Sequence, residues 1–166
     1  MSNVHSKITS DFLEKLERII NDSTVETLEQ LFGHRVHANG YRGDGSDIIV
    51  AYVSFLEGTE KIRFCFVFDR PFIGFLTSKI YSIADFSDEE VRVAYEDTAS
   101  ELSNIICNQI KYFMNSHGFH SVMELPVVET PANGMADIHN ENIVHVNFTS
   151  SHMDMETNAI TIGMVA

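Results

Sequence analysis

Apolar side chains recur at helical spacing near the start of the chain. Their positions predict a helix over residues 10–21, capped by Ser10 or Asp11. Its apolar stripe is Phe12, Leu13, Leu16, Ile19 and Ile20. The polar run 21–23 predicts a break, after which a second short helix begins with Thr24 as its cap and ends at Gly33. The stripe of this second helix is Val25, Leu28, Leu31 and Phe32.

The period of the pattern changes in the next part of the chain. Residues 47–56 and 62–68 are rich in Ile, Val, Tyr and Phe, which predicts two strands joined by a hairpin turn at 57–60. Residues 42–46 predict a loop; they lack the Gly-Lys-Ser/Thr ending and the following helix of a phosphate-binding loop. Pro71 predicts the first turn of a third helix, which extends to about Ile83.

The longest helical pattern of the chain covers residues 91–115, after an acidic linker at 85–90 that is expected to begin this element. It ends at the pair His117-Gly118. Residues 119–128 then predict a strand, and Pro126 within it indicates an edge, a bulge or a strand end, because proline cannot donate to a sheet ladder. A turn is expected at 130–134.

Two further strands, residues 142–149 and 159–165, predict a closing hairpin across 150–158. Hairpins that alternate with helices are typical of an α+β fold with a mainly antiparallel sheet, and not of a doubly wound parallel sheet. The length of 166 residues is that of one ordinary domain, so a single domain over residues 1–166 is expected.

Composition narrows the classes of partner and location. Hydrophobic residues make up 44% of the chain, enough for a sizeable core, and the net charge of −13 argues against nucleic acid or an anionic membrane as the partner. No apolar run approaches the roughly 18–20 residues of a membrane span, and the start has no apolar export signal. Cys65 and Cys107 lie in apolar segments, which indicates buried thiols, with a disulfide as the alternative. A cytoplasmic location is therefore expected.

The long helix has two chemically different faces. One face is apolar and comprises Leu102, Ile105, Ile106, Ile110 and Phe113. The opposite face carries Asp97, Glu101, Asn104 and Asn108, which fall within roughly 60° of one another at 100° per residue. The simplest interpretation is an ordinary solvated face. Two features favour a special role: no basic residue occurs between Glu96 and Gln109, and asparagine is a poor helix former.

The spacing along this face resembles a known family signature. Asp97, three residues, Glu101, two residues and Asn104, followed after 21 residues by Pro126, is similar to the pattern of the CheC/CheX family of chemotaxis phosphatases. The last step is one residue shorter than in the family, a difference that a loop at Gly118 can absorb. The sharp part of the resemblance is 97–128, and in loose form it covers most of the chain. It implies a two-layer α+β fold in which an antiparallel sheet packs against long helices.

The resemblance also implies a reaction. Members of the family hydrolyse the aspartyl phosphate of a CheY-like receiver domain, so Asn104 is expected to orient the attacking water and Glu101 to dock on the receiver's active-site lysine. Asp97, Asn108 and Pro126 are the expected partner-binding residues. The chain needs no cofactor of its own in this scheme, because the receiver supplies Mg²⁺. An acyl phosphate is already reactive, so the remaining task is to position a water, which an amide can do as donor and acceptor.

Some family members carry the signature on two helices. The first helix of this chain offers Ser10, Glu14 and Glu17 at the corresponding spacing, without the asparagine. A single motif resembles the CheX branch, which implies a homodimer built by joining or exchanging sheet elements. The chain departs from the family at Ser103, where glycine is common, and at Cys107 and Asn108, where small residues are common. These departures bear on the choice of receiver and on the rate.

Other functions remain open on the sequence. The main alternative is a non-catalytic CheX-like module that docks a receiver or dimerises in a signalling complex, since the resemblance extends to flagellar motor switch proteins. A small-molecule sensor is a third possibility. No zinc pattern links the eight histidines to the cysteines, so no metal site is expected, and Cys107 has no basic neighbour that would activate it. Core or interface packing is expected of Met153, Met155 and Met164.

Overall fold

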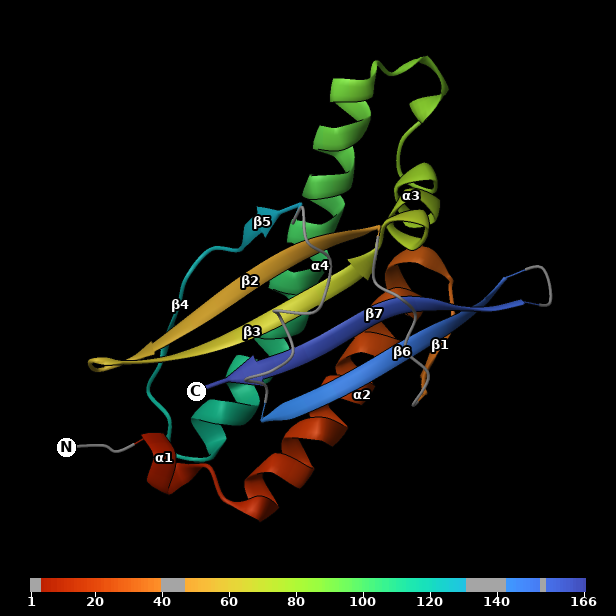
Figure 1. Cartoon of the computed structure of the whole chain (residues 1–166). Helices are drawn as coiled ribbons and strands as arrows, with labels where there is room; N and C mark the ends of the chain where they lie inside the picture. Colours follow the sequence, from red (N-terminus) through yellow and green to blue (C-terminus); the bar gives the residue numbers. More distant parts are fainter. Residues whose placement is uncertain (1–3, 40–46, 131–142, 153–154) are drawn as a thin grey trace.

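An antiparallel sheet forms one layer of the protein in the computed structural model, which describes residues 4–39, 47–130, 143–152 and 155–166 (Figure 1). Within those residues the strands are β1 (Val36–Ala38), β2 (Ile48–Glu57), β3 (Glu60–Asp69), β4 (Val122–Met123), β5 (Val127–Glu129), β6 (Val144–His152) and β7 (Met155–Val165). The strand order is β1-β6-β7-β3-β2-β4, and β5 also pairs with β2. Every pairing is antiparallel, which confirms the predicted fold class.

Helices form the second layer. The helical elements are α1 (Val4–Lys7), α2 (Ser10–Phe32), α3 (Arg70–Ser78), the 3-10 turn η1 (Ile83–Asp85) and α4 (Asp88–Ser116). Figure 1 shows α2 and α4 crossing one face of the sheet, with α3 beside the first half of α4. Four strand phenylalanines, Phe55, Phe64, Phe66 and Phe68, are fully buried against the apolar stripes of α2 and α4. The hydrophobic core therefore lies between the two layers.

The predicted break at residues 21–23 is wrong, because α2 continues from Ser10 to Phe32. Ser23 and Thr24 are buried on the face that packs into the protein, and packing overrides their weak helix propensity. The start of the helix also differs from the prediction: the hydroxyl of Thr9 caps it by accepting from the backbone N–H of Phe12 at 3.1 Å. The predicted end at Gly33 is confirmed, with φ of 61° in the left-handed region that favours glycine.

The third helix is shorter than predicted. Pro71 does lie in its first turn, but α3 ends at Ser78, and the chain then passes through η1 to the start of α4. Ser87 and Glu90 form a capping box there, so α4 begins at Asp88, within the acidic segment 85–90 that is expected to lead into this helix. The long helix predicted over 91–115 is otherwise confirmed.

The predicted strand over 119–128 consists of two short strands, β4 and β5, separated by residues 124–126. Both pair with β2 at the edge of the sheet, as the proline indicates. The closing hairpin is longer than predicted, because residues 150–152 and 155–158 extend β6 and β7. The loop expected at 42–46 and most of the turn expected at 130–134 lie outside the described residues.

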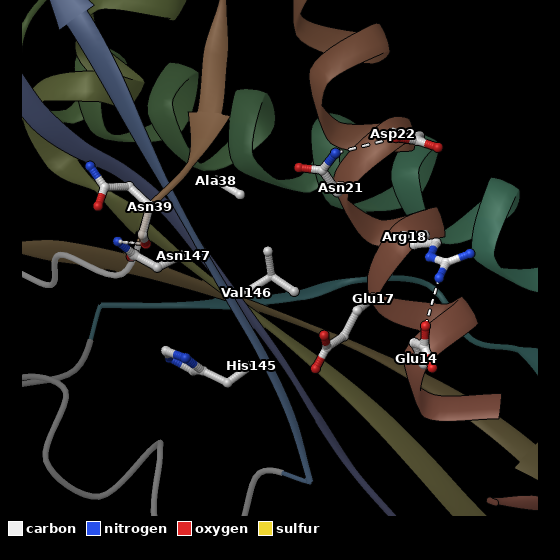
Figure 2. Close-up of a pocket in the computed structure, with 10 residues that line it drawn as sticks. All are labelled: Glu14, Glu17, Arg18, Asn21, Asp22, Ala38, Asn39, His145, Val146 and Asn147. Carbon is white, nitrogen blue, oxygen red and sulfur yellow. Dashed lines mark hydrogen bonds and ion pairs between the residues drawn. The ribbon is translucent and has the colours of Figure 1, made fainter. Parts of the chain in front are cut away.

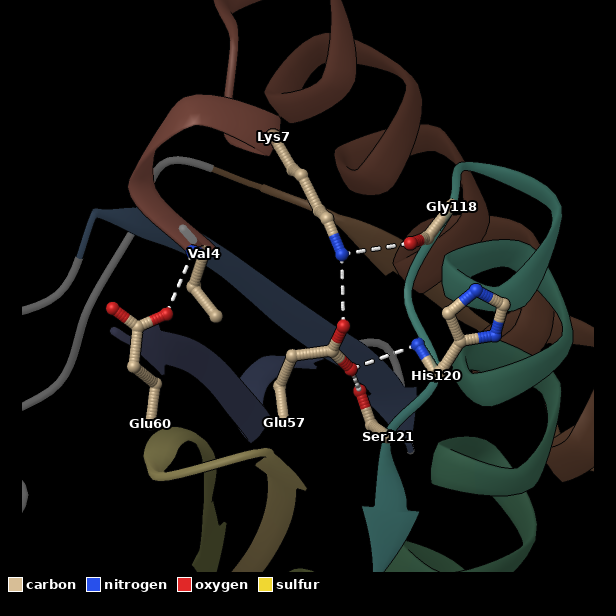
Figure 3. Close-up of polar contacts among 7 residues, drawn as sticks. All are labelled: Val4, Lys7, Glu57, Glu60, Gly118, His120 and Ser121. Carbon is tan, nitrogen blue, oxygen red and sulfur yellow. Dashed lines mark hydrogen bonds and ion pairs between the residues drawn. The ribbon is translucent and has the colours of Figure 1, made fainter. Parts of the chain in front are cut away.

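The carboxylate of Glu57 fixes the connection between α4 and β4 (Figure 3). Only 5% of the residue is exposed, and its oxygens accept from Lys7 Nζ at 2.8 Å, the backbone N–H of His120 at 2.8 Å and the hydroxyl of Ser121 at 3.0 Å. Lys7 also donates to the carbonyl of Gly118 at 2.8 Å. Burial alone raises the pKa of Glu57, but these donors outweigh it and hold the pKa below its ordinary value. We call this group the Glu57 cluster; it joins α1, the β2–β3 hairpin and the end of α4.

Candidate functional site

The four polar residues of the predicted motif lie together on the exposed side of α4. Asp97, Glu101 and Asn108 are exposed, and Asn104 is half-buried. The opposite side of the helix, with Leu102, Ile106 and Ile110, is buried in the core. Residues three and four apart on a helix are neighbours, so the carboxylate of Glu101 and the amide of Asn104 can reach the same partner surface. We call Asp97, Glu101, Asn104 and Asn108 the α4 stripe.

The two central side chains of the stripe are available for a partner. Among the described residues, no hydrogen bond or ion pair involves the carboxylate of Glu101 or the side-chain amide of Asn104. Asn108 donates from its amide to the backbone carbonyl of Asn104 at 3.0 Å, which occupies one of its own donors. The stripe therefore presents an acceptor at Glu101 and both a donor and an acceptor at Asn104.

Two of the three departures from the family pattern do not reach the surface of the stripe. Ser103 and Cys107 are both fully buried, and the hydroxyl of Ser103 donates to the carbonyl of Ser100 at 3.0 Å. A partner that approaches Glu101 and Asn104 meets neither side chain directly. Asn108 is the departure that is exposed on the stripe.

Pro126 lies in the segment that runs beside α4. It is half-buried and immediately precedes β5, which contacts α4. Its neighbours Leu125 and Val127 are exposed to 83% and 58%. Sequence reasoning did not single out these two residues, although both flank the proline of the motif. They add exposed apolar side chains at the β2 edge of the sheet.

The first long helix presents a different polar surface. Figure 2 shows a groove where α2 faces β1 and β6, lined by Glu14, Glu17 and Asn21 among others. Glu14 is paired with Arg18 at 2.6 Å, and the amide of Asn21 donates to Asp22 at 3.2 Å. Position 17 holds a carboxylate where the motif requires an amide, so within the described residues α2 does not repeat the arrangement of α4.

Cys65 on β3 lies in a small apolar cluster apart from the main core, whereas Cys107 on α4 lies in the main core; both are free thiols. Burial raises the pKa of Cys65 to about 12 and raises that of Cys107 well above its ordinary value. Neither thiol is therefore activated as a nucleophile.

Several of the histidine rings have structural partners, among them His117, whose Nδ1 atom lies 2.9 Å from the carbonyl of Phe113. His34 is buried, with its Nε2 atom 2.5 Å from the hydroxyl of Ser150, and His37 contacts the hydroxyl of Thr149 at 3.2 Å. In the part of the chain that the structure describes, no group of three His, Cys, Asp or Glu residues is arranged to hold a metal ion. Met164 is fully buried in the core, whereas Met153 and His139 lie outside the described residues.

Comparison with known proteins finds similarity in structure. No protein-family model matches the chain, and no curated protein matches it. Among solved structures, CheX in the CheX–CheY–BeF₃–Mg²⁺ complex from Borrelia burgdorferi is 18% identical, with a TM-score of 0.68 over 91% of this chain and 98% of that one. A CheC-like superfamily protein from Shewanella sp. PV-4 is 16% identical, with a TM-score of 0.65 over 96% and 100%.

The chain has the CheC/CheX fold. The same fold covers more than one kind of protein, since FliY from Thermotoga maritima matches with a TM-score of 0.61 at 16% identity over 96% of this chain and 91% of that one. The fold therefore places the chain among CheC-like and CheX-like structures, and its activity has to be argued from the α4 stripe. None of the described helices is both long and apolar enough to cross a membrane.

Proposed function

We propose that this protein is a phosphatase that hydrolyses the aspartyl phosphate of a CheY-like receiver domain. The observation that carries the proposal is the pair Glu101 and Asn104 on the exposed side of α4, within a fold shared by the CheX of a CheX–CheY complex. In this scheme the receiver contributes the phosphorylated aspartate, its active-site lysine and its Mg²⁺. The phosphatase contributes groups that dock and position.

Asn104 is the catalytic residue of this proposal. Its amide has an acceptor oxygen and a donor nitrogen, so it can hold a water molecule in line with the phosphorus atom. Attack by that water forms a new P–O bond, breaks the bond to the receiver's aspartate and releases inorganic phosphate with a free carboxylate. Positioning of this kind lowers the entropic part of the barrier, and α4 suits it because a helix packed on a core is rigid.

Glu101 docks on the receiver in this proposal. A carboxylate one turn before Asn104 can pair with the lysine beside the phosphoryl group and so fix how deeply Asn104 enters the site. The absence of an intramolecular partner among the described residues means that Glu101 breaks no existing ion pair when it binds. Glu101 therefore contributes mainly to affinity, and Asn104 contributes mainly to turnover.

The test measures loss of phosphate from a panel of receiver domains loaded by a small-molecule phosphodonor. We expect the wild-type chain to accelerate the loss from at least one receiver. Asn104→Ala should lower the acceleration about 10²–10³-fold, while the variant still binds the receiver. Glu101→Gln should raise the apparent KM more than it lowers kcat. Gln30→Ala is the control, because Gln30 is an exposed carboxamide on α2, outside the α4 stripe, whose amide donates to Glu26 at 3.0 Å. Unchanged acceleration by Asn104→Ala would refute the mechanism.

The second candidate is a non-catalytic module that binds a receiver in a signalling complex. The similarity to FliY supports this second candidate, because it shows that the fold is not confined to proteins named CheC or CheX. The same assay separates the two: binding to an activated receiver without acceleration of phosphate loss supports the module. In either case we propose that the protein acts as a homodimer, as the single motif on α4 suggests.

A further inference from the structure

A small apolar groove adjoins the α4 stripe at its N-terminal end. It encloses about 300 Å³ between the turn that contains η1 and the first turns of α4. Its lining residues are Tyr81, Phe86, Glu89, Glu90, Val93, Ala94 and Asp97. Asp97 belongs both to this groove and to the α4 stripe, so the two surfaces are continuous.

Two of the four apolar side chains that line the groove are exposed to solvent. Tyr81 is 41% exposed and Val93 is 42% exposed, and the rings of Tyr81 and Phe86 lie 6.5 Å apart along the wall. Ile80, the neighbour of Tyr81, is 55% exposed. Grouped apolar exposure beside polar residues is typical of a surface that a partner covers.

The three carboxylates around the groove differ in whether they already have a partner. Glu89 is engaged by Arg92, and Glu90 accepts from the backbone N–H of Ser87 in the capping box of α4. No ion pair or hydrogen bond among the described residues occupies the carboxylate of Asp97. Asp97 is thus the groove carboxylate without a partner among the described residues, and it lies at the end of the groove nearest to Glu101.

We propose that this groove is a second docking point for the phosphorylated receiver and that it determines which receiver binds. The proposal rests on the proposed function. The groove binds an apolar side chain of the receiver against Tyr81, Phe86 and Val93. A neighbouring lysine or arginine of the receiver pairs with Asp97. Val93 and Asn104 are eleven residues apart, about 16 Å along the helix, so one receiver can cover both within an interface of ordinary size.

The test uses the receiver that the wild-type chain dephosphorylates and two groove variants. Val93→Arg fills the groove and repels a basic partner group, and Tyr81→Ser removes one apolar wall without adding charge. We expect each to raise the apparent KM, Val93→Arg by about tenfold or more, with kcat within about twofold of wild type. Asp97→Asn should raise KM and weaken its dependence on salt. Ile143→Arg is the matched control, because Ile143 is 47% exposed and lies beside β6.

Binding of each variant to the same receivers, activated with beryllofluoride and Mg²⁺, separates failure of this proposal from failure of the proposed function. Acceleration that requires Asn104, with unchanged KM in both Val93→Arg and Tyr81→Ser, would overturn the groove alone. A fall in kcat at constant KM would also overturn it, because docking acts on affinity. If the wild-type chain neither binds nor dephosphorylates any receiver, both proposals fall.

Discussion

The Glu57 cluster offers a stability prediction whose size can be worked from its contacts. Glu57→Gln keeps the shape of the side chain but removes its charge and replaces one acceptor oxygen with an NH₂ group. Three donors point at the carboxylate, from Lys7, His120 and Ser121, at 2.8 to 3.0 Å. The amide oxygen of glutamine can still satisfy part of this set, whereas its NH₂ group must face at least one donor.

The expected cost follows from these contacts. A hydrogen bond to a charged group contributes about 1.5–3 kcal/mol, and breaking a fully buried ion pair costs about 3–5 kcal/mol. The side chain of Lys7 is 20% exposed and also donates to Gly118, so its ammonium group recovers part of its solvation after the substitution. We therefore expect Glu57→Gln to lower the free energy of unfolding at pH 7 by about 2–3 kcal/mol.

The pH dependence gives an independent check on the charge. The pKa of Glu57 in the folded protein is held below its ordinary value of 4.5, so its stabilisation is fully present above about pH 4.5 and is lost as the pH falls through the folded pKa. The difference in the free energy of unfolding between wild type and Glu57→Gln should therefore be smaller at pH 3.5 than at pH 7. That pH is below the sequence pI of about 4.8, near which a low net charge promotes precipitation.

Urea unfolding followed by far-UV circular dichroism measures both effects. Glu124→Gln is the control, because Glu124 pairs with Lys61 at 3.6 Å on the surface and such pairs contribute about 0–1 kcal/mol. If Glu57→Gln costs no more than Glu124→Gln at pH 7, the contacts of the Glu57 cluster do not stabilise the fold.

Two further predictions concern the thiols and the oligomeric state. Because Cys65 and Cys107 are buried with raised pKa values, a thiol-specific colorimetric reagent at pH 8 should titrate neither in the native protein and both in denaturant; fast native labelling would contradict their burial. Sedimentation equilibrium should give a dimer mass that does not change with Asn104→Ala; a monomer at high concentration would contradict the CheX-like homodimer.

The sequence predicted those elements whose periodicity and caps agree with the tertiary packing. The β2–β3 hairpin and α4 are examples. The apolar runs of β2 and β3 are buried at nearly every position, and the apolar residues of α4 recur on one face, which is buried. The predicted break in α2 failed because Ser23 and Thr24 are small enough to be buried against the protein interior. Propensity describes an isolated segment and cannot include that contribution.

The candidate site divides in the same way. The α4 stripe could be predicted because four residues on one helix obey a fixed spacing. The groove could not, because Tyr81 and Phe86 come from a turn whose position depends on how α3 ends and on where the capping box starts α4. Leu125 and Val127 were missed for a related reason: exposure of apolar residues becomes visible only when β4 and β5 are placed at the edge of the sheet.

Stability and activity should separate at Asn104. Its side chain makes no hydrogen bond among the described residues, and asparagine is less favourable than alanine inside a helix by roughly 0.5 kcal/mol. Asn104→Ala should therefore leave the free energy of unfolding unchanged or raise it by about that amount, since the bond from Asn108 goes to the backbone of residue 104. Urea unfolding of both variants, Asn104→Ala and the control Gln30→Ala, measures this directly. A loss above about 1 kcal/mol would mean that Asn104 has a structural role. A stable variant without phosphatase activity would mean that this position sacrifices local helix stability for a chemical task.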